Sequence, residues 1–101
     1  MAEPKTLCIP KDAESDTEAH EVLRVWTGGE VEYVSITGNL FVDPKTWGYL
    51  LSQIARHIAR SYELNGHDSQ ANTLDLIRKQ FVECWNDPDG TSGELVDPKP
   101  D

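Results

Sequence analysis

The stretch Asp43–Leu64, DPKTWGYLLSQIARHIARSYEL, carries the clearest helix signals in the chain. Asp43 is a favoured N-cap residue, because its carboxylate can accept a hydrogen bond from the free backbone N–H of Thr46. Pro44 suits the first helical position, where its missing N–H group costs nothing. Asn65-Gly66, directly after the stretch, favours a left-handed C-terminal cap. These signals predict a helix over residues 43–64.

Apolar side chains follow one face of this predicted helix with helical spacing, which indicates the side that faces the core. They are Trp47, Leu50, Leu51, Ile54, Ile58 and Tyr62. Val42 and Trp47 also have the spacing of a hydrophobic staple. The opposite face carries a locally basic stripe, made of Tyr49, Gln53, Arg56 and Arg60. A solvated helix face is the ordinary interpretation of such a stripe, and a surface for an acidic peptide or for the acidic tail is the alternative.

Residues 21–37 have the pattern of an antiparallel β-hairpin. Gly28-Gly29 is a two-residue turn signal between two alternating runs. With that turn, Leu23 would face Val34 and Trp26 would face Val31. One face of the hairpin is then aliphatic and suits the core, with Leu23, Val25, Val34 and Ile36. The other face is half polar and carries Arg24, Trp26, Val31 and Tyr33.

A second helix is expected from about Ser69 to Trp85. Asp68 or Ser69 can cap its start, and Pro88 disfavours helix just before it. Because the link between the two helices is short, they should be antiparallel neighbours. We therefore predict an α+β fold in the order β-β-α-α, with the hairpin packed through its aliphatic face on two antiparallel helices.

The two ends of the chain differ in composition from this predicted domain. Residues 1–20 are mostly a flexible acidic lead, residues 21–86 form a single domain, and residues 87–101 have the composition of a disordered acidic tail. Thr6–Ile9 is a short apolar run between two prolines, and it could add a short N-terminal edge strand to the sheet.

Charge and composition exclude several classes of function. The chain has 18 acidic and 9 basic residues and a net charge of −9, which argues against binding the phosphate backbone of nucleic acid. It lacks the ~20 consecutive apolar residues of a membrane helix, and its start does not resemble a secretion signal, so we expect a cytoplasmic protein. Cys8 and Cys84 are then reduced thiols. No histidine or cysteine spacing indicates a metal site, and we expect no cofactor.

Two features stand out as candidate sites. Trp26, Val31 and Tyr33, beside Arg24, would form an exposed apolar patch unless the chain itself covers them, and such patches mark interfaces. Arg78 falls on the apolar side of the second helix. We expect it to lie over Trp85 or to pair with an acid such as Asp43 or Glu32, and an anion-binding role is the alternative.

Three stretches resemble a known family. They are EVLRVW (21–26), DPKTWGYLLSQIARHIARSY (43–62) and IRKQFVECWNDP (77–88). Together they are similar to a small bacterial family best known from alphaproteobacteria, domain of unknown function 5076. The resemblance implies a compact cytosolic domain and supplies no catalytic residues.

Two hypotheses about function follow. The first is a non-enzymatic protein-interaction module, either a homodimer or a binder of another protein, that uses the Trp26–Val31–Tyr33 patch. The second is a small-ligand (anion) binding protein or minor enzyme with a pocket near Arg78. We expect neither nucleic acid nor a membrane as partner.

Overall fold

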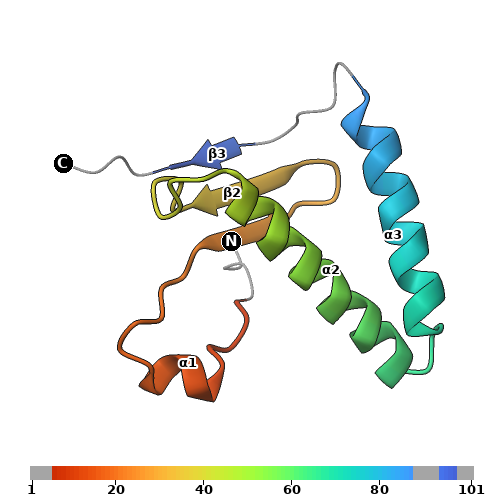
Figure 1. Cartoon of the computed structure of the whole chain (residues 1–101), viewed down its shortest axis with the longest axis horizontal. Coiled ribbons are helices and arrows are strands. Elements are labelled where there is room, and N and C mark those ends of the chain that lie inside the picture. Colours follow the sequence, from red (N-terminus) through yellow and green to blue (C-terminus); the bar gives the residue numbers. More distant parts are fainter. Residues whose placement is uncertain (1–5, 88–93, 98–101) are drawn as a thin grey trace.

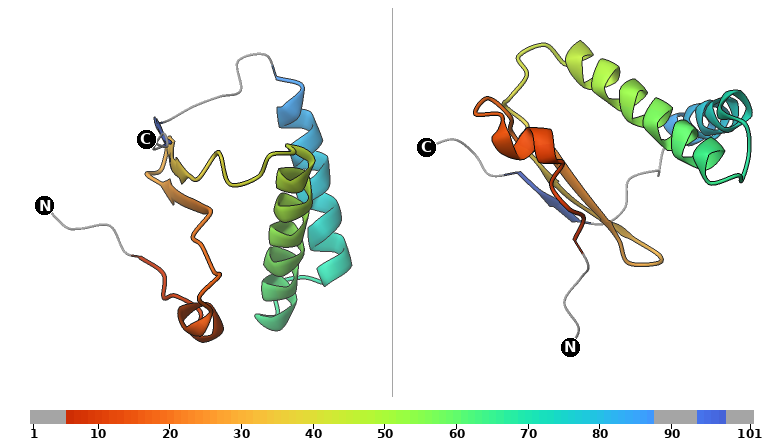
Figure 2. Two further views of the ribbon diagram at one scale, coloured as in Figure 1. Left: turned by 60° about the vertical axis from the view of Figure 1, so that its left-hand side comes forward. Right: turned by 90° about the horizontal axis from the view of Figure 1, so that it is seen from below.

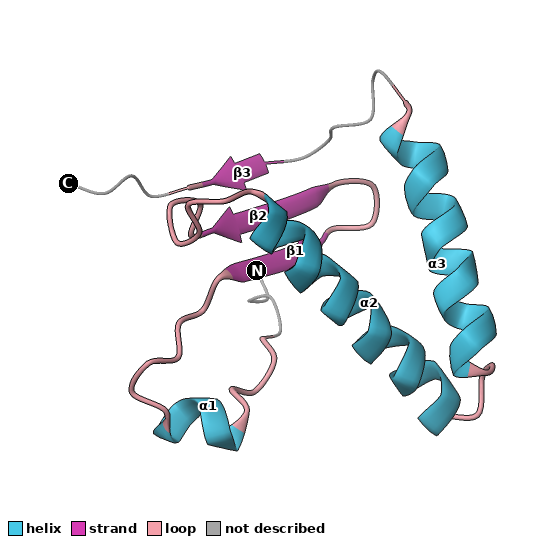
Figure 3. Ribbon diagram, viewed as in Figure 1, coloured by secondary structure: helices cyan, strands magenta, loops and turns pink. Residues whose placement is uncertain are grey.

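Figure 1 shows the computed structural model of the chain, which describes residues 6–87 and 94–97. The elements are α1 (Lys11–Ser15), β1 (Leu23–Thr27), β2 (Glu32–Ile36), α2 (Lys45–Leu64), α3 (Gln70–Trp85) and β3 (Glu94–Val96). The α+β class and the central order β-β-α-α are confirmed. Figure 3 shows the two additions at the ends, the short helix α1 and the short strand β3.

The hairpin of β1 and β2 is antiparallel as predicted, but its register differs by two residues. Leu23 pairs with Ile36 and Val25 pairs with Val34. The reason is a longer turn, in which the Gly28 N–H donates to the carbonyl oxygen of Val31 at 2.9 Å. Because side chains alternate along a strand, a shift of two leaves both predicted faces intact.

The third strand comes from the segment that the sequence assigned to the disordered tail, so residues 94–96 correct that boundary. β3 runs parallel to β2 and completes the order β1-β2-β3. Just beyond it, the Asp97 carboxylate accepts a hydrogen bond from the Gly38 N–H at 3.3 Å. A Cβ atom on Gly38 would lie 2.7 Å from that carboxylate, so a larger residue at this position would displace the Asp97 side chain. Thr6–Ile9 forms no strand, and Leu7 is 97% exposed.

The start of α2 differs in detail from the predicted cap and staple. The Asp43 carboxylate accepts from the N–H of Lys45 at 2.9 Å, whereas the Thr46 N–H donates to the Asp43 carbonyl. Val42 is 98% exposed and forms no staple. Phe41 takes that role, because its ring meets the Trp47 ring edge-on at a centroid distance of 5.1 Å.

The loop between α2 and α3 is built as the sequence indicated. Gly66 has a φ of +73°, and the His67 N–H donates to the Tyr62 carbonyl at 2.9 Å, which is a Schellman cap. The rings of Tyr62 and His67 lie 5.9 Å apart across this cap. Ser69 then caps α3 by accepting a hydrogen bond from the Asn72 N–H at 3.1 Å. The two helices are antiparallel, as Figure 1 shows.

The sheet and the helical pair form two layers with little contact between them. Figure 2 shows the pair standing beside the sheet, joined to it by the loop that leads into α2. Among the described residues, no strand Cα atom lies within 8 Å of a Cα atom of α2 or α3. The aliphatic face of the hairpin, which we expected to pack on the helices, is accordingly open in part, and Val25 is 55% exposed.

Candidate interaction surface

The sheet surface predicted from Arg24, Trp26, Val31 and Tyr33 is only partly open. Trp26 and Tyr33 are direct partners across the strands. Trp26 and Val31 are half-buried, while Tyr33 is 41% exposed. A Cβ atom on Gly28 would lie 3.0 Å from the Tyr33 ring, so the turn glycine lets that ring close over the hairpin end. The sequence analysis missed this second role of Gly28.

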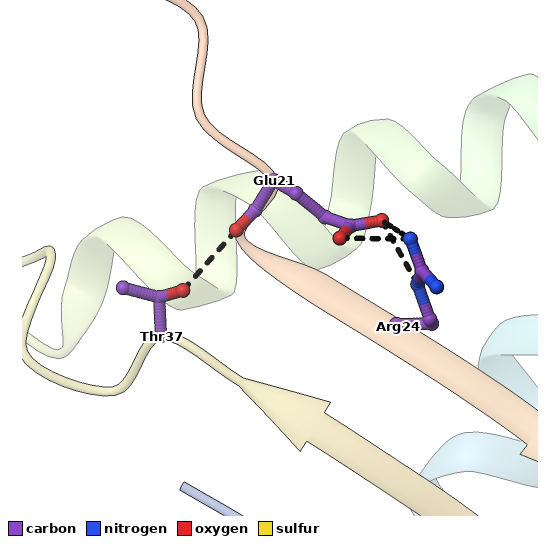
Figure 4. Close-up of polar contacts among 3 residues, drawn as sticks. All are labelled: Glu21, Arg24 and Thr37. Atoms are coloured by element: carbon purple, nitrogen blue, oxygen red, sulfur yellow. Dashed lines mark hydrogen bonds and ion pairs between the residues drawn. The ribbon is translucent and has the colours of Figure 1, made fainter. Parts of the chain in front are cut away.

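Arg24 forms an ion pair with Glu21 at the base of the hairpin, as Figure 4 shows. Its guanidinium donates to both carboxylate oxygens of Glu21, with a shortest distance of 2.8 Å. The carbonyl oxygen of Glu21 accepts a hydrogen bond from the Thr37 hydroxyl at 3.1 Å and ties the two ends of the hairpin together. Arg24 is therefore occupied within its own chain.

Arg78 and the basic stripe both lie on exposed helix surface. The Arg78 guanidinium pairs with Asp75 at 2.9 Å, one turn back along α3, and not with the more distant acids we considered. It is not among the residues that line the groove described below. Arg56 and Arg60 are exposed, as is Tyr49, while Gln53 is half-buried. Within residues 6–87 and 94–97 neither Arg56 nor Arg60 forms an ion pair.

Asp75 is the ionisable group whose environment is most clearly perturbed. Hydrogen bonds from Lys79 and then from Arg78 lower the pKa of the Asp75 carboxyl from its ordinary value. The Asp75 side chain is partly exposed at the helix surface, so the effect describes a surface ion-pair cluster. In the described part of the chain no ionisable side chain is buried, and no three His, Cys, Asp or Glu side chains converge as metal ligands would.

The largest departure from expectation is the exposure of the helix faces that the sequence assigned to the core. Among the described residues only Ala59 and Thr73 are buried. Large apolar side chains that we expected to be covered are 42% to 74% exposed: Leu51, Ile58 and Tyr62 on α2, and Phe81 and Trp85 on α3. No single-chain sequence signal distinguishes an apolar face that its own chain covers from one that a partner covers.

One groove lies between α2 and α3, next to the loop that joins them. Its volume is about 420 Å³, and its lining consists of Ile58, Tyr62, His67, Asp68, Thr73, Leu76, Ile77 and Gln80. The walls are mainly apolar. The Thr73 hydroxyl oxygen is buried at this groove without a hydrogen-bond partner in the described structure, which costs about 1–3 kcal/mol in a dry site.

The far end of α3 carries a second exposed apolar feature. The rings of Phe81 and Trp85 stack at a centroid distance of 5.5 Å, and Trp85 is 74% exposed. Cys84 is exposed as well, and its sulfur accepts a hydrogen bond from the Gln80 amide at 3.2 Å. Trp is the residue type most enriched at the energetic centres of interfaces, so this end of α3 also has interface character.

Among the described helices none combines the length and apolar character needed to cross a lipid bilayer.

Comparison with known proteins places the chain in a family. A solved protein from the photosynthetic bacterium Rhodopseudomonas palustrus CGA009, described as a "putative pyruvate dehydrogenase", is 34% identical. The alignment covers 93% of this chain and 95% of that one, with a TM-score of 0.71. No curated protein matches. The family described as Domain of unknown function (DUF5076) matches residues 6–89, and the chain belongs to that family.

Proposed function

We propose that this protein is a protein-association domain whose exposed apolar surfaces are covered by another folded chain. The observation that carries the proposal is the near absence of a core, because only Ala59 and Thr73 are buried among the described residues. Burying apolar surface is the main favourable term in folding. A chain that leaves Leu51, Ile58 and Trp85 in water therefore loses much of that stabilisation.

The accessible area supports the same conclusion. A folded monomer of 11.3 kDa should expose about 5,700 Å², whereas this chain exposes 9210 Å². The radius of gyration is 15.6 Å, against about 13 Å for a compact domain of this length. A stable interface needs only about 800 Å² from each partner. The accessible area and the radius of gyration both cover all 101 residues, including the 15 outside the described ranges, so only part of the excess belongs to the exposed faces of α2 and α3.

The chain's own remaining segments cannot supply the cover. Residues 1–5, 88–93 and 98–101 of the printed sequence contain Met1 as their one large apolar side chain. Burial of an apolar side chain needs apolar partners of similar size, and these segments consist mainly of Pro, Gly, Asp and Lys. The proposal therefore assigns the cover to another folded chain.

The enzymatic description of the Rhodopseudomonas protein is not transferred to this chain. Catalytic acids and bases are normally placed in clefts that perturb them through burial and neighbouring charges. In the described residues the groove between α2 and α3 offers His67 and Asp68 at its exposed rim, and no ionisable group is buried. The small-ligand alternative at Arg78 has less support, because its guanidinium is exposed and paired with Asp75.

The association domain can be tested with the purified chain. We expect either a sedimentation mass above 11.3 kDa or, for a chain that lacks its partner, a monomer that binds 1-anilinonaphthalene-8-sulfonate. A monomer that leaves the dye unbound and unfolds cooperatively would contradict the proposal, because it would have to cover its apolar faces by itself.

A further inference from the structure

We propose that the chain covering the apolar surface is a second copy of this one, packed through α2 in antiparallel orientation about a twofold axis. This inference rests on the association function proposed above and names its partner. The surface involved, here called the α2 stripe, consists of Trp47, Leu51, Ile54, Ala55, Ile58 and Tyr62.

The spacing of the α2 stripe is that of a helix–helix seam. Trp47, Leu51, Ile54 and Ile58 recur at intervals of four, three and four residues, which is the alternation of the a and d positions in a heptad. α3 borders only one end of this seam, because Ile58 and Tyr62 line the groove between α2 and α3 whereas Trp47, Leu51 and Ile54 do not. Ala59, the fully buried residue of α2, lies about 100° around the helix from Ile58, and Ile58 itself stays 42% exposed.

The order of residues along the stripe favours antiparallel pairing with an identical helix. From Trp47 to Tyr62 the intervals are four, three, one, three and four, so the positions read the same in both directions. A twofold axis between Ile54 and Ala55 would set Leu51 opposite Ile58 of the second copy. It would also set Trp47 opposite Tyr62. A twofold interface requires this kind of self-complementarity.

The ends of the stripe are already held in place within each chain. Trp47 packs edge-on against Phe41, and Tyr62 lies against His67 across the Schellman cap. Side chains fixed before association lose less conformational freedom when an interface forms. The two aromatic residues are therefore well placed as anchors.

Charge separates this surface from the rest of the molecule. The chain carries a net charge of −9, so two copies repel each other over most of their surface. Between Asp43 and Glu63 there is no acidic residue. Arg56 and Arg60 flank Ile58 by two residues on either side, which turns them to the opposite face of the helix. The α2 stripe is thus an uncharged path along which two copies can approach.

The test compares Ile58→Glu and Leu51→Glu with a matched control, Gln53→Glu, which adds a negative charge on the polar face of the same helix. We expect wild type and Gln53→Glu to sediment at twice the 11.3 kDa of one chain. Both stripe variants should sediment as monomers or fail to fold, because each buries a charge at the seam.

A cross-linking experiment tests the antiparallel register without destabilising the fold. Leu51→Cys and Ile58→Cys are prepared as separate proteins, each with Cys8→Ser and Cys84→Ser. When mixed and oxidised they should form a covalent heterodimer. Each alone should react poorly, because two copies of position 51 would lie about 10 Å apart along the axis, beyond the ~7 Å Cα separation of a disulfide.

The outcomes separate this inference from the association function. A dimer that persists in Ile58→Glu, or cysteine variants that cross-link equally well alone, would overturn the α2 seam. A wild-type monomer that binds the dye would overturn the second copy as partner and leave the association function standing. A monomer without dye binding would overturn both.

Discussion

The sheet and the helical pair are held together by different interactions. The sheet depends on backbone hydrogen bonds between distant segments, since β3 pairs with β2 from more than 50 residues away. The helical pair depends on neighbouring residues, namely the Schellman cap at Gly66 and the Ser69 cap. Within one chain the loop that leads into α2 joins the two layers, and Phe41 of that loop packs on Trp47. The helical pair is therefore defined by local interactions and the sheet by a distant pairing, and the apolar faces of both layers are left partly uncovered.

The largest effect on this comparison should come from Trp47→Ala, which removes the contact between α2 and the loop that joins the two layers. Trp47 is half-buried, so we expect a loss of about 2 kcal/mol in the free energy of unfolding, roughly half the cost of a fully buried aromatic. Chemical denaturation at a single protein concentration measures it. Tyr49→Ala is the control, because Tyr49 is 67% exposed on the same helix and should change stability by less than about 0.5 kcal/mol. Equal losses would contradict the role of Trp47.

Two glycines test whether the layers open separately. Gly29 and Gly66 have φ values of +99° and +73°, and a Cβ atom on either would meet no neighbour within 4 Å. Alanine at each position should therefore cost about 1–2 kcal/mol through backbone strain alone. Hydrogen exchange should show Gly29→Ala lowering amide protection chiefly in β1 and β2, and Gly66→Ala chiefly in α2 and α3. A uniform loss of protection in both variants would mean that the layers unfold as one unit.

A smaller effect is expected at the start of α3. Ser69→Ala removes the side-chain oxygen that accepts the Asn72 N–H and should cost about 1 kcal/mol. The matched control is Ser52→Ala in the middle of α2, where the Ser52 hydroxyl donates to the Tyr49 carbonyl and alanine is the better helix former. Thermal unfolding should show a lower midpoint for Ser69→Ala and an unchanged or higher one for the control. The reverse order would contradict the cap assignment.

The smallest effect concerns the ion-pair cluster on α3. An NMR titration should place the pKa of the Asp75 carboxyl below the ordinary value of an aspartate, and Lys79→Gln should raise it. Because the folded-state pKa is depressed, the contribution of the cluster is present above the ordinary carboxyl pKa. It disappears as the pH falls through the folded-state value. An Asp75 pKa that Lys79→Gln leaves unchanged would show that the cluster has no effect on this carboxyl.

Local structure proved predictable from the sequence, whereas cover by other elements did not. The helix caps at Gly66 and Ser69 could be predicted, because each cap involves residues that are close together in the chain. The predicted hairpin register was wrong by two residues, because the turn includes Val31 as well as Gly28 and Gly29. β3 was missed because three residues in an acidic, proline-containing segment carry no pattern, and only the pairing with β2 reveals them.

The candidate surface was harder to predict for a related reason. The periodicity of α2 identified Leu51, Ile58 and Tyr62 as apolar-face residues, which they are. The periodicity could not show that these side chains stay 42% to 47% exposed. It indicates that a helix face is apolar, but it does not identify the element or the chain that covers that face. The same periodicity placed Arg78 on the apolar side of α3. Its long side chain nevertheless reaches water and pairs with Asp75.

The central claim is that a second copy completes the hydrophobic core of this chain, and the concentration dependence of thermal unfolding tests it most directly. If folding requires association, the midpoint of unfolding must rise with protein concentration by mass action. We predict such a rise over a hundredfold range, together with a sedimentation mass of twice 11.3 kDa. A midpoint that is the same at every concentration, with a mass of 11.3 kDa, would contradict the claim.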